Sequence, residues 1–528
     1  MEMFSVAIGN VFNPACLALI WAGTMLGIIF GSIPGLSATM AVVLFLPMTF
    51  SMNGTQLFGE LMLNQSEGII YTLVFMIVTC VIVMGGISGG LISAILLKIP
   101  GTPSSISTVF DGGPMADKGQ AGRALGVGIL ASGIGSLIGI VALIFISPLL
   151  AKVCLLFSAA DYFGVAVFSL TIIASLSGKD MLKGLLAGLL GIALSMVGMA
   201  PVDAELRFIF GNYQLMAGFD ITVLLIGVFA VTDIIQAGLN RRHLADGFEK
   251  KKFHLKGYGL SVKEFITQIP NFLISSVIGI AIGILPGIGG STGGLMAYTA
   301  EKNRSKYPEK FGTGIIDGVI ASETANNAVI GGSMVPLLCM GIPGNTVAAI
   351  FLGGLTVHGI SPGPLIFDKS AQYVYGIYLA LIVSTIFMVV FERLGLPIFA
   401  KLLDIPKHIL LPIIMVMCCV GAFSSNSRVF DVQCVLVFGL IGLVMKVFKM
   451  PTTPLIIGFI LGPMFEENLR RALQASHGSW SVFVTRPICC AFLIAAVVFC
   501  TWTVRNNLKA KKIAETQGQS FDTAEEEG

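Results

Sequence analysis

The sequence has little charge and little histidine. Of its 528 residues, only 12% are Asp, Glu, Lys or Arg, and only five are histidine. Soluble domains carry roughly 25% charged residues because a surface in contact with water needs them. This composition therefore excludes an ordinary soluble protein. The net charge of +3 is also too small, and the basic residues are too scattered, for a nucleic-acid-binding surface.

Several motifs are absent as well. The sequence has no Walker A motif, no zinc-binding His-Glu-x-x-His and no dinucleotide fingerprint, so we expect no direct ATP drive within the chain, no catalytic residue, no metal site and no organic cofactor. The ten cysteines lack metal-ligand spacing, and we interpret them as small core residues. No Lys or Arg precedes the first apolar run, which argues against a cleavable signal peptide.

Apolar residues make up most of the chain. They account for 55% of it, the mean hydropathy is +0.89, and many apolar runs reach about 18 residues, the length that crosses a bilayer. Runs such as 371–391 and 482–503 show no alternation of polar and apolar residues, so they do not resemble barrel strands. The sequence predicts an all-α polytopic membrane protein with about 11–14 membrane segments.

Basic loops orient the predicted segments, because Lys and Arg in short loops favour the cytoplasm. This rule makes residues 241–263 a cytoplasmic linker and residues 505–528 a cytoplasmic, disordered tail. It places the N-terminus and the loop 358–370 on the opposite side of the membrane, and the segment 111–123 in the cytoplasm. We therefore predict a first transmembrane repeat over 1–240 and a second over 264–504.

Pro-Gly interruptions recur in both predicted repeats. Residues 27–35 read GIIFGSIPG and residues 279–287 read GIAIGILPG, at an offset of 252 residues. A second pair, Ile99-Pro100-Gly101 and Ile342-Pro343-Gly344, follows in the same order. Because the segments after this pair fall on opposite sides of the membrane, we expect inverted repeats with broken or re-entrant helices, the arrangement typical of secondary transporters. The alternative is that the glycines only pack helices together and the prolines only kink them.

Residues at and after the interruptions are our predicted substrate site. Interrupted helices leave amides free to hold an anion, and hydroxyl groups donate to carboxylates. The predicted substrate-binding residues are Pro34, Gly35, Ser37, Lys98, Gly101, Thr102, Ser104, Ser105, Ser107, Gly287, Ser291, Gly344, Asn345 and Thr346. In the alternative, the hydroxyls bond to carbonyls one turn back and Lys98 extends to the membrane surface.

One acidic residue is the predicted ion-coupling group. Glu323 shares a helical face with Asn326 and Asn327, and this set suits Na⁺ or a proton. A polar clamp between helices is the alternative. We assign no chemistry to Asp111, Asp317 or His358.

A short motif raises a different function. Residues 86–90 match the Gly-x-Ser-x-Gly pattern of serine hydrolases, with Ser88 as the nucleophile. The match is weak because a nucleophilic serine needs a base within hydrogen-bond reach, and the chain is rich in glycine. An intramembrane hydrolase and a passive anion channel therefore remain as alternatives to a transporter.

Three blocks of sequence resemble the large membrane subunit of the tripartite tricarboxylate transporter family (TctA-like). They are GIIFGSIPGLSATMAVVLFLPMTF (27–50), GGLISAILLKIPGTPSSISTVFDGGPMADKGQAGRALG (89–126) and ASETANNAVIGGSMVPLLCMGIPGNTVAAIFLGGLTVHGISPGP (321–364). The resemblance implies a multi-pass permease of the bacterial inner membrane. The N-terminus, which the basic loops place opposite the cytoplasm, is then expected in the periplasm. The resemblance also implies a small membrane subunit and a periplasmic solute-binding protein as partners.

The resemblance further implies uptake of a carboxylate, citrate among them, by symport with Na⁺ or H⁺. Two positions differ from many members of that family: Ser88 stands where Tyr is common, and Lys98 where Asn is common. The expected substrate is accordingly a tricarboxylate such as citrate, or a related dicarboxylate or monocarboxylate.

Overall fold

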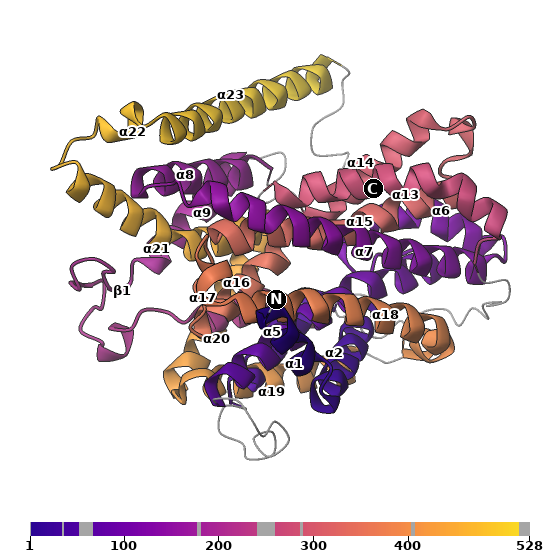
Figure 1. Cartoon of the computed structure of the whole chain (residues 1–528), viewed down its shortest axis with the longest axis horizontal. Helices are drawn as coiled ribbons and strands as arrows, with labels where there is room; N and C mark the ends of the chain where they lie inside the picture. Colours follow the sequence, from indigo (N-terminus) through magenta and orange to yellow (C-terminus); the bar gives the residue numbers. More distant parts are fainter. Residues whose placement is uncertain are drawn as a thin grey trace. The chain divides into compact units, whose positions relative to one another are not determined.

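The structure is a computed structural model, and it describes residues 2–33, 36–51, 67–176, 181–239, 259–285, 289–402 and 407–516. Three predicted site residues, Pro34, Gly35 and Gly287, lie outside the described residues, as do most of the predicted linker and the last twelve residues of the predicted tail. The described part is almost entirely helical (Figure 1), and its only strands are the two-residue β1 and β2. The prediction of an all-α protein is confirmed.

The chain divides into two compact units. The first comprises residues 1–155 and 220–444, and the second residues 156–219 and 445–528. The first unit contains α1 (Glu2–Val11), α2 (Pro14–Ser32), α3 (Ala38–Ser51), α5 (Glu67–Leu96), η2 (Pro103–Ser105), α6 (Ile106–Asp117), α7 (Ala121–Cys154), α10 (Ile221–Leu225), the π-helical η4 (Ile226–Val231), α11 (Thr232–Leu239), α13 (Val262–Ile284), α14 (Gly289–Arg304), η5 (Pro308–Lys310), α15 (Ile316–Met340), α16 (Thr346–Val357), α17 (Ile366–Lys369), α18 (Ala371–Leu402), α19 (Lys407–Asn426) and most of α20 (Val429–Val447).

The second unit contains α8 (Ala159–Leu176), α9 (Met181–Ser195), β1 (Gly198–Met199), β2 (Leu206–Arg207), η3 (Tyr213–Leu215), α21 (Thr452–Ala475), α22 (Val482–Thr485) and α23 (Pro487–Thr516). Each unit contains segments from both predicted repeats. A division of the chain by spatial contacts does not test whether its two halves arose by duplication. The repeat boundaries stay a prediction. Helix α23 continues to Thr516, and so extends into the segment where we expected the tail to start.

Five described helices are long and apolar enough to cross a bilayer. They lie within Ala121–Cys154, Ile221–Leu239, Val262–Ile284, Ala371–Phe399 and Val429–Val447. Several further apolar helices are shorter than a full span, among them Thr346–Val357. A multi-pass membrane protein is therefore confirmed, and the number of complete crossings stays a prediction.

The four Pro-Gly positions coincide with helix ends. Helix α2 ends at Ser32 and α13 at Ile284, just before the first pair of interruptions. Helix α5 ends at Leu96 and α15 at Met340, just before the second pair. Proline lacks the N–H that a continuing helix needs, and its ring clashes with the preceding turn. The prediction that helices break at these positions is confirmed.

The second pair of interruptions makes equivalent contacts in the two halves of the sequence. A Cβ on Gly101 would lie 2.2 Å from the carbonyl oxygen of Gly31, and a Cβ on Gly344 would lie 2.3 Å from that of Gly283. Only glycine allows so close an approach of two backbones. The close helix packing that we kept as an alternative therefore holds for these glycines, together with the helix breaks.

The long helices of the two halves exchange partners. Helix α7, from the first half, packs against α15 and α13 of the second half. Helix α18, from the second half, packs against α5 and α2 of the first half. Figure 1 shows α7 beside α15 and α18 beside α5 and α2. The crossed packing places polar residues of one half against those of the other. The inverted orientation of the halves stays a prediction.

The second unit has its own ion-paired cluster. Arg207 of β2 donates two hydrogen bonds to Glu466 of α21, at 2.6 and 3.0 Å. Arg470 bonds to the same carboxylate at 2.9 Å and to Asp203, and the hydrogen bond from Arg470 lowers the pKa of Asp203. These pairs tie the β1–β2 hairpin to α21.

Candidate functional site

Glu323 is the centre of a buried hydrogen-bond network in the first unit. Its side chain is fully buried in the middle of α15. One carboxylate oxygen accepts a hydrogen bond from Thr108 of α6, and the other accepts from Ser132 of α7 at 3.1 Å and from Asn327 at 3.4 Å. The donors come from three helices, so the predicted ion-coupling residue is also a point where α6, α7 and α15 meet.

The Asn326 side chain also lies against α14. A Cβ on Gly290 would lie 2.8 Å from the Oδ1 atom of Asn326 and 3.0 Å from the Cβ atom of Ser104. One turn further along α14, a Cβ on Gly294 would lie 2.7 Å from the Oγ atom of Ser107. The small-residue face of α14 therefore covers Ser104, Ser107 and Asn326.

Several of these polar atoms are buried without a hydrogen-bond partner. They are the hydroxyls of Ser107 and Ser322, both side-chain atoms of the Asn326 amide, and the Oδ1 atom of Asn327. More than about 90% of buried polar groups in proteins are paired, so a group of unpaired ones needs an explanation. We call Ser104, Ser107, Ser322, Glu323, Asn326 and Asn327 the Glu323 cluster. Its unpaired donors and acceptors are available to a polar ligand or to water.

Two helix N-termini converge on the Glu323 cluster. Helix α14 begins at Gly289, beside Asn326, and α6 begins at Ile106, beside Ser104 and Ser107. The first amides of a helix have no partner within it, and the helix dipole adds roughly half a positive charge there. The cluster thus combines a carboxylate, which attracts a cation, with two helix ends that attract an anion.

Asp111 joins the two halves close to this cluster. It is fully buried in α6, and its Oδ1 atom accepts backbone hydrogen bonds from Gly312 at 2.9 Å, Gly314 at 2.7 Å and Ile315 at 3.0 Å. These amides belong to the loop before α15. We assigned Asp111 no chemistry from the sequence and considered it close to a loop. In the structure its role is structural, because these hydrogen bonds hold α6 against that loop.

The predicted hydroxyl residues have different surroundings. The Thr102 Oγ1 atom lies 3.0 Å from the hydroxyls of both Ser104 and Ser105, so these three form one network after the first Ile-Pro-Gly. Ser107 belongs to the Glu323 cluster. The Ser37 side chain caps α3 by accepting from the Met40 amide at 3.1 Å. The structure therefore brings Ser104 and Ser107 to the cluster and uses Ser37 as a helix cap.

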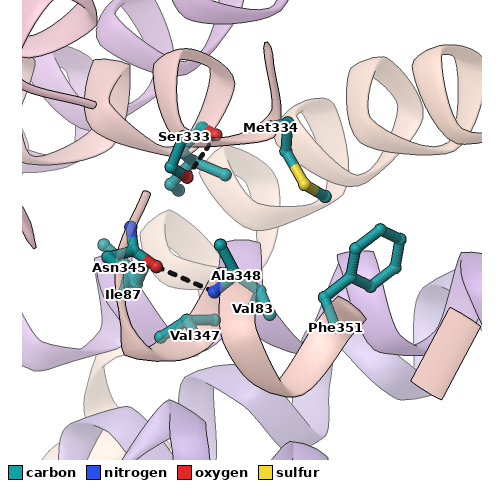
Figure 2. Close-up of a pocket in the computed structure, with 9 residues that line it drawn as sticks. Val83, Ile87, Ser333, Met334, Asn345, Val347, Ala348 and Phe351 are labelled. Carbon is teal, nitrogen blue, oxygen red and sulfur yellow. Dashed lines mark hydrogen bonds between the residues drawn. The ribbon is translucent and has the colours of Figure 1, made fainter. Parts of the chain in front are cut away.

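The predicted residues of the second half lie beside a different pocket (Figure 2). The Asn345 Oδ1 atom accepts from the Ala348 amide at 2.8 Å and so caps α16, while Ser333 donates to the Ile330 carbonyl at 3.0 Å. The pocket is lined by Val83, Ile87, Ile330, Ser333, Met334, Asn345, Val347, Ala348 and Phe351.

Gly344 lies against Gly283 at the interruption. Thr346 is the first residue of α16 and Ser291 the third residue of α14.

Lys98 lies away from the Glu323 cluster and forms an ion pair. Its ammonium group contacts the carboxylate of Asp117 at the end of α6, and both side chains are about half exposed, at 46% and 48%. Its φ of 57° is a left-handed backbone conformation in the turn that follows α5. Lys98 therefore holds the ends of α5 and α6 together in this state.

Ser88 has a carboxylate rather than a histidine as its partner. Its hydroxyl donates to the Oε2 atom of Glu392 in α18 at 2.9 Å, and both residues are fully buried. A serine that donates to a carboxylate without an intervening imidazole lacks the base–nucleophile arrangement of a hydrolase. The hydrolase alternative is not favoured.

Sequence reasoning did not name Ser132, Ser322 or Glu392 as functional residues. Ser132, on α7, is 191 residues from Glu323 in the sequence, and no motif around Ser132 identifies it as a partner of Glu323. Glu392 ends an apolar run and precedes Arg393, so it resembled a charge at a helix end. Thr108 offered a signal, because it closes the run of hydroxyl residues after the first Ile-Pro-Gly.

Comparisons with known proteins agree with these features. Residues 17–457 match the family model described as the tripartite tricarboxylate transporter TctA family. An uncharacterized 52.8 kDa protein in the TAR-I ttuC' 3' region of Agrobacterium vitis is 32% identical over 96% of this chain and 97% of its own length. An uncharacterized protein in the TAR-II ttuC' 3' region of the same organism is 36% identical over 44% of this chain and 97% of its own length. No solved structure matches the chain.

Proposed function

The chain belongs to the tripartite tricarboxylate transporter TctA family, and we propose that it imports an organic carboxylate by symport with Na⁺ or H⁺. In this proposal it is the large permease subunit of a secondary transporter in the bacterial inner membrane. A small membrane subunit and a periplasmic solute-binding protein complete the system. The expected substrate is a tricarboxylate such as citrate, or a related dicarboxylate or monocarboxylate.

The single observation that carries the proposal is the composition of the Glu323 cluster. Unpaired buried donors from Ser107, Ser322 and Asn326 lie at the N-termini of two helices, next to a buried carboxylate. Donors at helix N-termini suit the carboxylate groups of an organic anion. A buried carboxylate suits a cation, because an isolated charge is costly in an apolar interior. Anion and cation sites side by side are what symport requires.

The packing of α14 suggests how access is controlled. Gly290 and Gly294 lie so close to the cluster that a single added carbon would clash. A carboxylate substrate is much larger, so it binds only when α14 withdraws from α6 and α15. We therefore propose that α14 moves between substrate-bound and closed states.

The remaining predicted site residues keep their proposed role near the interruptions. Thr102 and Ser105 position the hydroxyl of Ser104 through their shared network. Lys98 is proposed as a carboxylate anchor that becomes available when its ion pair with Asp117 opens. Asn345 and Thr346 belong to the corresponding interruption in the second half, where the helix α16 begins.

Uptake into proteoliposomes tests the proposed function. The chain is reconstituted with its small membrane subunit, its binding protein is loaded with radiolabelled citrate, and a Na⁺ or pH gradient is imposed. We expect saturable uptake that stops when ionophores discharge the gradient. Uptake that continues at the same rate without a gradient contradicts symport and indicates a passive channel. A panel of unlabelled tri-, di- and monocarboxylates then identifies the substrate by competition.

A further inference from the structure

Another buried carboxylate, on α18, lies outside the Glu323 cluster. Glu392, on α18, is fully buried, and its Oε2 atom accepts the hydrogen bond from Ser88 at 2.9 Å. Its Oε1 atom is buried without a partner. A carboxylate with one bonded and one unpaired oxygen is costly to keep ionised in an apolar interior. Neither the symport scheme nor the helix packing described above requires a carboxylate there.

No cation compensates Glu392 among the described residues. On α5, the segment 81–96 has no ionisable side chain, and on α2 the only one is Cys16, near the opposite end of the helix. On α7, Arg123 pairs with Glu264 at 2.5 Å and Lys152 belongs to the last turn. The neighbouring Arg393 on α18 is exposed.

The carboxylate of Glu323 also acts electrostatically on Glu392. The same stretch of α7 contacts Glu323 and the part of α18 one turn before Glu392. Ser132 bonds to Glu323, and the adjacent Gly133 packs against Val389, one turn from Glu392 on α18. Two negative charges so placed repel each other strongly in a low dielectric. Loading a cation on one therefore favours the ionised form of the other.

We infer that Glu392, held by Ser88, is a second coupling site of the transporter, and that it carries a proton. This inference rests on the proposed symport function. A proton from one compartment adds to the free Oε1 atom of Glu392, and it leaves to the other compartment when the helices rearrange. Only an O–H bond forms and breaks. The cycle then moves one cation at the Glu323 cluster and one proton at Glu392.

The surroundings of Glu392 favour a proton over a metal cation. Hard cations such as Na⁺ need several oxygen ligands, and within the described part of the chain the only hydrogen bond to the side chain of Glu392 comes from the Ser88 hydroxyl. The other neighbours on α18 are apolar, among them Val389 and Leu396. A neutral, protonated carboxyl group is the form that such surroundings accommodate.

Infrared difference spectroscopy of the purified full-length chain in lipid nanodiscs tests this inference without any substrate. A pH titration should reveal the carbonyl-stretch band of a buried protonated carboxyl, and Glu392→Gln should remove that band. Ser88→Ala should keep the band but shift its position, because the hydrogen bond to the carboxyl is lost. If the wild-type and Glu392→Gln spectra are identical at every pH, the inference is wrong.

Coupled flux in proteoliposomes gives a second, independent measurement. With citrate as the probe and its binding protein present, proton uptake and citrate uptake are recorded together. We expect Glu392→Gln to lower the number of protons moved per citrate by one. As a control, Glu467→Gln removes only a partly exposed ion pair with Arg471 and should leave the ratio unchanged. An unchanged ratio in Glu392→Gln overturns the inference.

The two failures are distinguishable. If the wild-type complex does not transport citrate or another carboxylate, the proposed function is contradicted, and the infrared band alone decides whether Glu392 carries a proton. If transport is normal and the ratio does not change, the proposed function stands and the role of Glu392 is rejected.

Discussion

Ser132 of α7 donates a hydrogen bond of 3.1 Å to Glu323 of α15, and the two residues belong to different halves of the sequence. The bond is buried on both sides. It makes the predicted coupling carboxylate depend on the contact between two long helices. A movement of α7 relative to α15 would change the donors around Glu323, which links helix rearrangement to cation binding.

Glu323→Gln should abolish gradient-driven uptake while the chain still folds, because the amide keeps the size of the side chain but cannot bind a cation by charge. Ser132→Ala should change proton binding at Glu323, because the Ser132 hydroxyl stabilises the ionised carboxylate and a hydrogen bond to a charged group contributes about 1.5–3 kcal/mol. Its loss favours the protonated carboxyl, so with H⁺ as the coupling ion the H⁺ concentration for half-maximal uptake should fall by roughly 10- to 100-fold. Initial uptake rates measured against Na⁺ at fixed pH, and against pH at fixed Na⁺, check both. Uptake in Glu323→Gln that still follows the gradient would remove Glu323 from coupling.

Gly294→Val should block closure of α14 over the Glu323 cluster. Its first added carbon would lie 2.7 Å from the Ser107 hydroxyl, and overpacking of this kind costs about 1–3 kcal/mol. We expect uptake to fall at least tenfold, with retained binding of the chain to its small membrane subunit. Gly238→Ala is the matched control, because a Cβ at Gly238 has no atom within 4 Å. Equal uptake in Gly294→Val and the wild type would argue against closure by α14.

Asp111→Ala should destabilise the protein without touching the proposed ligands. Its removal leaves the amides of Gly312, Gly314 and Ile315 without their acceptor, and a buried unsatisfied donor costs about 1–3 kcal/mol. The melting temperature of the detergent-solubilised protein should fall. Asp117→Ala, at an exposed ion pair on the same helix, should change the melting temperature far less. A similar small change in both variants would mean that the Asp111 bonds do not hold α6 in place.

Lys98→Gln and Asp117→Asn should act in opposite directions if Lys98 binds the substrate carboxylate. Lys98→Gln removes the positive charge and should raise the citrate concentration for half-maximal uptake. Asp117→Asn releases Lys98 from its ion pair and should lower that concentration. If both variants match the wild type, Lys98 only closes the turn between α5 and α6.

The opposed orientation of the two halves is open to direct labelling. In a background without cysteine, Gln120→Cys and Ser361→Cys place exposed thiols in the loops after the first and second Ile-Pro-Gly. A membrane-impermeant maleimide added to intact cells should label Ser361→Cys, and it should label Gln120→Cys only after the cells are opened. Labelling of both from one side would mean that the repeats are parallel.

The helix breaks, and the need of Glu323 for polar partners, were predictable from the local sequence. Proline and glycine interrupt helices whatever surrounds them, and an acidic residue within an apolar run needs a partner wherever the run packs. The partners themselves depended on distant helices. Ser88 meets Glu392 across 304 residues and Thr108 meets Glu323 across 215, because α18 packs against α5 and α6 packs against α15. Asn345 and Ser37 were predicted to bind substrate, and in the structure both cap helices. The sequence does not distinguish the two roles, because a polar residue after a helix break suits either.

The exchange of long helices between the halves also affects how the chain is made. During synthesis, α7 enters the bilayer well before its partner α15 leaves the ribosome. The interval between α5 and its partner α18 is longer still. During that interval, the serines that later bond to Glu323 and Glu392 face lipid or temporary neighbours. The protein therefore reaches its final arrangement only after most of the second half has been inserted, and a truncated first half would lack the helices that bury it.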